Sequence, residues 1–155
     1  MEKEQNKIWE QKKQEYPYAT EIWLYMKNLG WNDYVCAGIM GNLMAEVGGQ
    51  TLNIQYWLGD GTGYYGMCQW STRYCPEVYG TNLSTQCEYL KNTIAREFNN
   101  YGGNYYKGFN YNAFLNLHNE RDAAVAFAKC YERCASFSYG VRQTNATKAY
   151  NYFVN

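Results

Sequence analysis

The most regular hydrophobic pattern in the chain lies between positions 32 and 49. Apolar residues at positions 35, 39, 43 and 47 repeat with the spacing of one face of an amphipathic helix. Asn32 is well placed to cap the start of this helix, and Gly48-Gly49 follow its end. Glu46 lies in the last turn, along the apolar stripe. The sequence therefore predicts a helix that carries a partly desolvated carboxyl group near its C-terminal end.

Other stretches of the chain also have helical spacing, and one polar stretch does not. Residues 48–66 are rich in Gly, Tyr and Asn and contain Asp60-Gly61, a pair that favours a hairpin turn. Thr20 is suited to cap the helix that follows it, and Ser84 precedes another predicted helix. The further helices expected cover residues 1–15, 20–29, 67–75, 85–99, 112–118, 121–133 and 143–153. We expect an α+β, mainly helical domain at residues 18–155 with a small β-hairpin and loop lobe, preceded by a charged extension at residues 1–17.

Charge and hydropathy exclude two classes of partner. Lys+Arg and Asp+Glu both number 14, so the net charge is zero and nucleic-acid binding is not expected. The longest mostly apolar run, residues 35–45, is too short to cross a bilayer, so membrane insertion is not expected. The N-terminus is charged and lacks the apolar region of a secretory signal peptide. We therefore expect any action outside the cell to depend on lysis, a particle or a fusion partner.

The cysteines do not predict a metal site. The chain has six cysteines but only one histidine, and no Cys-x-x-Cys pair occurs. A zinc site is therefore not expected. Free thiols are the first expectation for a protein made in a reducing cytosol. A disulfide such as Cys68–Cys75 stays open for a protein that meets an oxidising exterior.

The position of Glu46 combines two effects that disfavour its ionised form. Partial desolvation and the negative end of the helix macrodipole both raise the pKa of a carboxyl group. A raised pKa suits a general acid that works near neutral pH. The other interpretation is a structural glutamate that bends past the glycines into solvent. On position alone we favour the structural interpretation, because structural carboxylates outnumber catalytic ones.

Three segments together resemble a known family. They are Gly30-Trp31 followed by residues 37–46 (AGIMGNLMAE), residues 65–70 (YGMCQW), and residues 124–133 (AVAFAKCYER) followed by Arg142 and Ala146. In this order and spacing they are similar to the phage tail-tip lysozymes. That family is part of the lysozyme-like superfamily, which includes goose-type lysozymes and lytic transglycosylases. The resemblance covers about residues 20–153, and it reverses the preference for Glu46 in favour of catalysis.

The resemblance implies a lysozyme-like fold with the hairpin lobe beside an active-site cleft. The implied reaction is cleavage of the β-1,4 bond between N-acetylmuramic acid and N-acetylglucosamine, with Glu46 as general acid and no metal or organic cofactor. The implied partners are peptidoglycan glycan strands, with other phage tail proteins or further domains of a longer chain as additional partners. The implied location is the phage tail, or the cell wall after release by lysis. A lytic transglycosylase, which leaves anhydro-muramic ends, is the alternative reaction.

A second carboxylate is expected, because glycoside hydrolysis usually uses a pair. Asp60 in the cleft-side loop is the best candidate, although Asp-Gly is also ordinary turn chemistry. Glu132 and Arg133 on the late helix are interpreted as structural polar contacts or as a solvated surface.

Four other side chains are candidates for substrate binding. Gln69 has an amide suited to a sugar or a water molecule, and it suits a hydrogen bond that fixes a loop equally well. Tyr64 and Tyr65 are suited to stack on sugar rings or to cover the hairpin. Tyr131 is expected either to approach Glu46 or to pack in the core.

Two other functions remain as alternatives. Cys36 near a helix N-terminus, with His118 as base, would suit a cell-wall cysteine peptidase or amidase. However, the residues around Cys36 belong to the lysozyme-like segment, and His118 has no clear orienting partner. The second alternative is a non-catalytic glycan-binding tail module, which the retained Glu46 disfavours.

Overall fold

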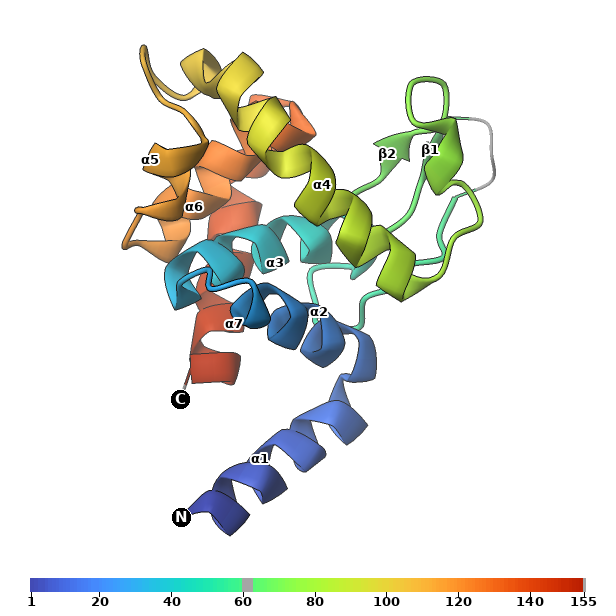
Figure 1. Ribbon diagram of the computed structural model, residues 1–155, viewed down its shortest axis with the longest axis vertical. Coiled ribbons are helices and arrows are strands. Elements are labelled where there is room, and N and C mark those ends of the chain that lie inside the picture. The colour runs from blue at the N-terminus through green and yellow to red at the C-terminus, as the bar shows by residue number, and fades with distance from the viewer. Residues whose placement is uncertain (60–62, 155) are drawn as a thin grey trace.

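Helix α3 (Asp33–Val47) runs through the middle of the molecule, and other helices pack around it (Figure 1). This computed structural model describes residues 1–59 and 63–154. Every residue from Val35 to Met44 is buried, so the helix is enclosed on all sides and is not a surface helix with one apolar face. Cys36, Ala37 and Met40 explain the difference, because they are apolar at positions outside the predicted stripe. The predicted Asn32 cap is confirmed, since its side chain accepts a hydrogen bond from the Val35 amide.

Two glycines let neighbouring helices come very close to α3. The main neighbours are α6 (Glu120–Phe127) and α7 (Tyr139–Val154). A Cβ atom at Gly38 would lie 2.5 Å from Ala123 Cβ, and one at Gly41 would lie 2.5 Å from the Arg142 carbonyl oxygen. A side chain at either position would therefore force the helices apart.

The remaining helices largely follow the predicted ones, and the ends differ. The structure has α1 (Glu2–Glu15), α2 (Pro17–Asn28), α4 (Leu83–Tyr101), α5 (Tyr111–Leu115) and the π-helix η3 (Ala128–Glu132), together with short 3₁₀ turns at Pro76–Val78, Gly102–Asn104 and Ser136–Ser138. The predicted Thr20 cap is wrong, because Thr20 lies inside α2, where its hydroxyl donates to the Lys12 carbonyl. Helix α4 begins at Leu83, two residues before its predicted start, and Asn82 caps it.

The β lobe contains one short hairpin. Strand β1 (Tyr64–Tyr65) pairs antiparallel with β2 (Trp70–Ser71), which confirms the α+β, mainly helical class. The predicted helix at 67–75 is wrong, because Gly66 (φ 91°) and Gln69 (φ 51°) adopt left-handed conformations that no α-helix continues. The Asp60-Gly61 pair lies outside the described residues.

A buried amide joins this lobe to the helical body. The Gln86 side chain on α4 accepts from the Met67 amide at 2.8 Å and donates to the carbonyls of Tyr56 and Thr81. All three contacts are to backbone groups of the lobe or its flanking loops. The position of the lobe beside α4 is therefore fixed by hydrogen bonds as well as by packing.

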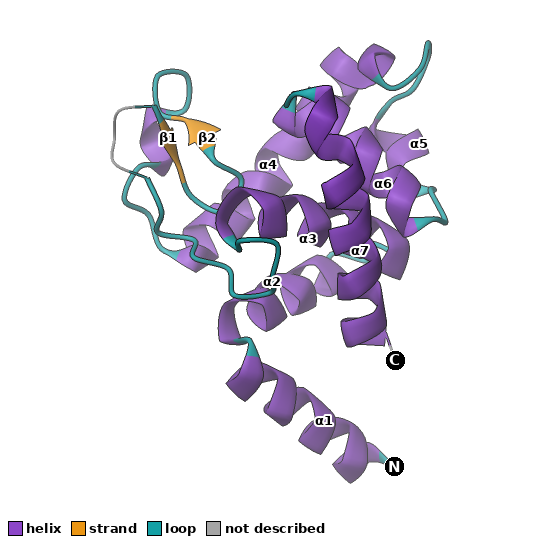
Figure 2. Ribbon diagram, turned by 180° about the vertical axis from the view of Figure 1, so that it is seen from behind, coloured by secondary structure: helices purple, strands orange, loops and turns teal. Residues whose placement is uncertain are grey.

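Helix α1 projects from the end of the molecule that lies opposite the β lobe (Figure 2). None of its residues is buried, but the Trp9 ring stacks on Phe153 of α7 at a centroid distance of 6.3 Å. Both chain ends lie on the side of the molecule away from the β lobe (Figures 1 and 2). Among the described residues, no helix has the length and apolar character required to span a bilayer.

Candidate active site

Glu46 occupies the last turn of α3, where the central helix meets the loop that leads to the β lobe. The Glu46 side chain is 17% exposed, so the carboxyl group is partly desolvated but still reachable. The helix ends directly after Val47, where the Gly48 amide donates to the Met44 carbonyl. The predicted position of this carboxyl group at a helix C-terminus is therefore what the structure shows.

A buried arginine contacts the Glu46 carboxylate. Arg142 of α7 is only 5% exposed, and its Nη2 donates to Glu46 Oε1 at 2.7 Å. Its Nη1 donates to Asn42 Oδ1 at 2.9 Å, and its Nε donates to Ser138 Oγ at 3.0 Å. A cation here is favoured by the negative end of the α3 macrodipole. Arg142 and Glu46 therefore form an ion pair between α7 and α3.

Asn42 holds the arginine in place. It lies one turn before Glu46 on α3 and is fully buried. Its Nδ2 donates to the carbonyls of Gly38 and Ala124, which leaves its Oδ1 oriented toward Arg142. The guanidinium plane is therefore fixed by α3 and α7 together.

A second carboxyl group, Glu132, lies beside Glu46. Glu132 Oε1 is buried and has no hydrogen-bond partner among the described residues. Burial raises the pKa of Glu132 well above its usual range, and the Glu46 carboxylate raises it further through charge repulsion and a hydrogen bond. Arg142 and a hydrogen bond with the Cys68 thiol act in the opposite direction. The balance favours a neutral Glu132.

The π-helix η3 explains why the sequence pattern did not identify Glu132. The pattern predicts an α-helix from 121 to 133, but α6 ends at Phe127 and continues as η3. The Arg133 amide donates to the Ala128 carbonyl, five residues back, and Arg133 adopts φ 51°. This wider turn changes the direction of the last side chains relative to α-helical spacing, and such π segments are frequent at functional sites. No apolar periodicity signals a π turn.

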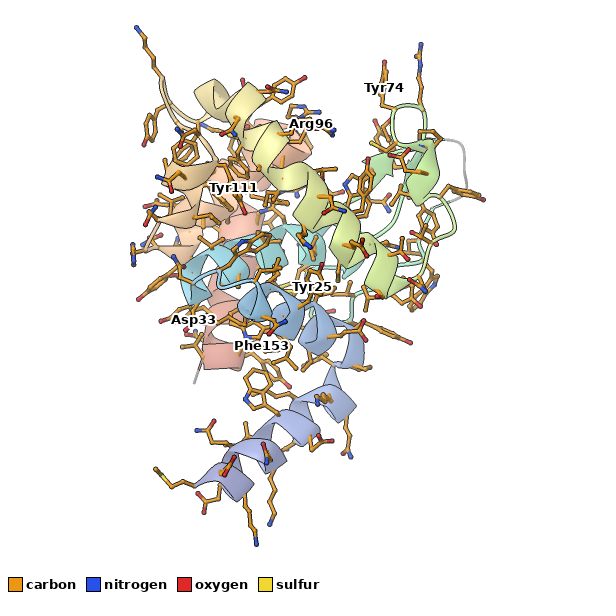
Figure 3. The ribbon with its side chains drawn as sticks, in the orientation of Figure 1. Tyr25, Asp33, Tyr74, Arg96, Tyr111 and Phe153 are labelled. Atoms are coloured by element: carbon orange, nitrogen blue, oxygen red, sulfur yellow. The ribbon has the colours of Figure 1, made fainter. Side chains whose placement is uncertain are left out.

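A cleft of about 550 Å³ lies between the β lobe and α4. Figure 3 labels one residue from each wall, Tyr74 from the lobe and Arg96 from α4. Glu132 and Cys68 line this cleft, so the carboxyl pair is adjacent to it. The other lining residues are Tyr64, Gln69, Trp70, Ser71, Cys75, Tyr89, Thr93, Glu97, Tyr101, Tyr131 and Arg133.

The predicted binding residues differ in their access to this cleft. Tyr64 lines it and is 61% exposed, whereas Tyr65 is 7% exposed and is not among the lining residues. Gln69 lines it, but its Nε2 donates to the carbonyls of Leu58 and Gly66, so the amide nitrogen fixes the loop.

Tyr131 is a wall residue whose hydroxyl group is already occupied. It is buried, and its hydroxyl accepts from Trp70 Nε1 at 2.8 Å and lies 2.7 Å from Thr93 Oγ1. Its ring stacks on Phe127. Asp60, the predicted second carboxylate, lies outside the described residues.

The cysteine–histidine alternative has no geometric support. Cys36 is fully buried, and burial raises the pKa of its thiol to about 12. His118 is exposed, and its Nδ1 lies 2.7 Å from the Asn116 carbonyl oxygen. A buried thiol of this kind does not supply the thiolate that a nucleophile needs. All six cysteines fall within the described residues and are free, so the 68–75 disulfide is not formed.

Metal ligands do not cluster in the described parts of the chain. Across residues 1–59 and 63–154, no group of three or more His, Cys, Asp or Glu side chains is arranged to hold a metal ion.

Comparison with protein families shows a lytic enzyme that acts on the bacterial cell wall. The family described as phage tail lysozyme matches residues 17–153, nearly the whole chain. The chain belongs to the phage tail lysozyme family. Peptidoglycan is thus its substrate class, and a phage tail is a location that fits the family. Neither the curated proteins nor the solved structures gave a match.

Proposed function

We propose that this chain is a muramidase that cleaves the β-1,4 bond between N-acetylmuramic acid and N-acetylglucosamine, with Glu46 as general acid. The observation that carries the proposal is the position of Glu46. It ends the central helix, keeps 17% of its side chain exposed, and lies beside Glu132, which lines the cleft. A rigid helix thus presents a reachable acid next to a space suited to a polymer.

Arg142 is placed to stabilise the negative charge that forms on Glu46 during the reaction. When Glu46 gives its proton to the leaving oxygen, it becomes a carboxylate. The Arg142 guanidinium already lies 2.7 Å from Glu46 Oε1 and is held by Asn42 and Ser138, so no reorganisation is needed. The ion pair therefore stabilises the product of proton transfer more than its reactant.

The walls of the cleft suit a glycan strand. Tyr64, Tyr74 and Tyr101 line it with exposed rings, which can stack on sugars. Tyr131 and the oxygen of Gln69 are proposed to complete the binding surface, and Tyr65 is proposed to support it from the interior. Asp60 remains a candidate for the residue that activates water.

The protein is proposed to act where a phage meets the wall. Peptidoglycan strands are the proposed partner, with other tail proteins or further domains as additional partners. Delivery on the virion tail and release by lysis both fit this role.

Substitution of Glu46 by its amide tests the proposal. Glu46→Gln keeps the size of the side chain but cannot donate a carboxyl proton. We expect a loss of about 100-fold or more in the release of reducing ends from purified peptidoglycan. Glu88→Gln, an exposed change on α4, is the matched control and should retain the wild-type rate. An undiminished rate in Glu46→Gln would overturn the proposal.

Mass spectrometry of the products identifies the reaction. Reduced muramic ends after borohydride treatment are expected for the muramidase. Anhydro-muramic ends would instead identify a lytic transglycosylase, and reducing glucosamine ends would show that the other glycosidic bond is cut. Binding to sacculi without any product would indicate a glycan-binding module.

A further inference from the structure

We infer that Glu132 is a positioning residue for Glu46: the two carboxyl groups share a proton beside the cleft, and Glu132 stores the proton that Glu46 delivers to the substrate. This inference rests on the proposed role of Glu46 and deepens it. It assigns a function to a residue whose pattern in the sequence indicated only structural contacts.

The placement of the Glu132 side chain supports a functional role. Its Oε1 is buried without a hydrogen-bond partner among the described residues, yet the residue lines the cleft. A buried oxygen without a hydrogen-bond partner costs free energy, and in a native protein such a group calls for an explanation, of which a catalytic role is one. The residue ends a π-helix and is followed by a left-handed Arg133, an irregular backbone that directs it to this position.

The balance of charge among Glu46, Glu132 and Arg142 also supports a shared proton. Glu132 and Glu46 are within hydrogen-bonding reach of each other, and Arg142 is the buried cation that acts on both. One guanidinium balances one carboxylate. Two adjacent carboxyl groups in a partly desolvated site do not both ionise, so the pair retains one proton.

The surrounding groups do not change this balance. Cys68, from the turn between β1 and β2, is a neutral thiol because burial raises its pKa well above the usual range. On α4, Glu97 pairs with Arg133 and Arg96 at the surface, and so its charge is compensated locally. The groups that face Glu132 from the elements around it are Glu46 of α3, Arg142 of α7, Cys68 of the hairpin turn, Tyr131 of η3 itself, and the Glu97, Arg96 and Arg133 cluster.

The shared proton complements the Arg142 contact. Arg142 pairs with Glu46 Oε1 and so supports the carboxylate that remains after proton transfer. A neighbouring neutral carboxyl group replaces the proton that Glu46 delivers. As the bond between the anomeric carbon and the glycosidic oxygen breaks, its electron pair stays on the oxygen, which takes the proton from Glu46. Glu132 supplies the proton to Glu46, and water that adds to the anomeric carbon returns one proton to the pair.

The pH dependence of activity tests this assignment. In Glu132→Gln the amide fills the same space but holds no titratable proton, so the carboxyl pair loses its stored proton. We expect the alkaline limb of the pH profile of kcat to move to lower pH by about one unit or more. At acid pH the variant should stay within a few-fold of the wild type. Glu132→Asp keeps a carboxyl group and should recover most of the alkaline limb, and Glu88→Gln should leave the profile unchanged.

A structural role gives a different result. If Glu132→Gln lowers kcat by the same factor at every pH, the inference is overturned. Infrared spectroscopy of the wild-type protein provides a measurement that does not depend on folding of a variant. A protonated carboxyl band should persist at neutral pH, and its absence would also overturn the inference. Activity retained in Glu46→Gln would refute the proposed function, whereas an inactive Glu46→Gln with an unshifted Glu132→Gln profile would refute this inference alone.

Discussion

Arg142 Nη2 and Glu46 Oε1 lie 2.7 Å apart, although 96 positions separate the two residues in the chain. Their contact joins the central helix α3 to the last helix α7. Because both side chains are largely withdrawn from solvent, the pair contributes to folding as well as to the site.

Loss of the arginine should therefore reduce stability strongly. Arg142→Met leaves Glu46 and Asn42 without their buried partner, and we expect the free energy of unfolding to fall by about 3 kcal/mol or more. Chemical denaturation measures this change. The double variant Glu46→Gln/Arg142→Met removes both charges and should recover at least about 1 kcal/mol of the loss.

A surface arginine provides the control for that measurement. Arg133 pairs with Glu97 at 3.2 Å, but its side chain is 42% exposed. Arg133→Met should therefore cost no more than about 1 kcal/mol. Equal losses of unfolding free energy in Arg142→Met and Arg133→Met would contradict a special role for the buried Arg142–Glu46 pair.

Gly41 controls the distance between α3 and α7. The Cβ atom of Gly41→Ala would lie 2.5 Å from the Arg142 carbonyl oxygen, so the helices must separate. We expect a loss of about 1–3 kcal/mol in unfolding free energy and a lower kcat, because Arg142 moves with its helix. Gly140→Ala on α7 has no atom within 4 Å of the new Cβ and should be neutral or stabilising by up to about 1 kcal/mol. Gly41→Ala with wild-type stability would show that the contact relaxes without cost.

The raised pKa of Glu132 makes stability depend on pH. Below the ordinary carboxyl pKa of 4.5 the folded and unfolded states both hold the proton, and Glu132 costs nothing. As the pH rises above 4.5 the unfolded chain releases the proton while the folded protein retains it, so stability falls by up to about 1.4 kcal/mol per pH unit. Glu132→Gln lacks this penalty. The stability of the variant relative to wild type should grow from pH 4.5 toward neutral, and a constant difference in urea denaturation would argue against a neutral Glu132.

The four buried thiols should be unreactive in the folded protein. Burial raises the pKa of Cys36 and of Cys87 to about 12, and that of Cys130 to about 11. At pH 8 a thiol reagent should modify only the half-buried Cys75 and Cys134 in the native state, and all six cysteines in denaturant.

Cys36 should also be dispensable for catalysis. Cys36→Ala removes one buried sulfur, and we expect a stability loss of about 1 kcal/mol with peptidoglycan cleavage retained. A folded Cys36→Ala protein that no longer acts on peptidoglycan would instead favour the cysteine peptidase.

The helical framework could be predicted from the sequence because its signals are local. The Asn32 cap, the apolar repeat and the closing glycines define α3 to within a residue or two. What the pattern could not show is that α3 is enclosed on every side, because that depends on which helices pack against it. Gly38 and Gly41 were the available signal, since small residues in a helix permit close neighbours.

The partners of Glu46 could not be predicted in the same way. Arg142 lies within a segment that resembles the family, but nothing local pairs it with a residue of α3. The position of Glu132 could not be predicted, because the chain changes there from α- to π-helical spacing. The helix predicted at 67–75 does not form, because Gly66 and Gln69 adopt left-handed conformations. Each failure arises where backbone irregularity, rather than periodicity, sets the direction of a side chain.

The stacking of Trp9 on Phe153 joins α1 to the end of α7, and both chain ends lie on the side opposite the β lobe (Figures 1 and 2). An anchor or purification tag attached at either terminus would therefore not obstruct the entrance between the lobe and α4. Immobilised through either end on a bead, the protein should still digest insoluble sacculi.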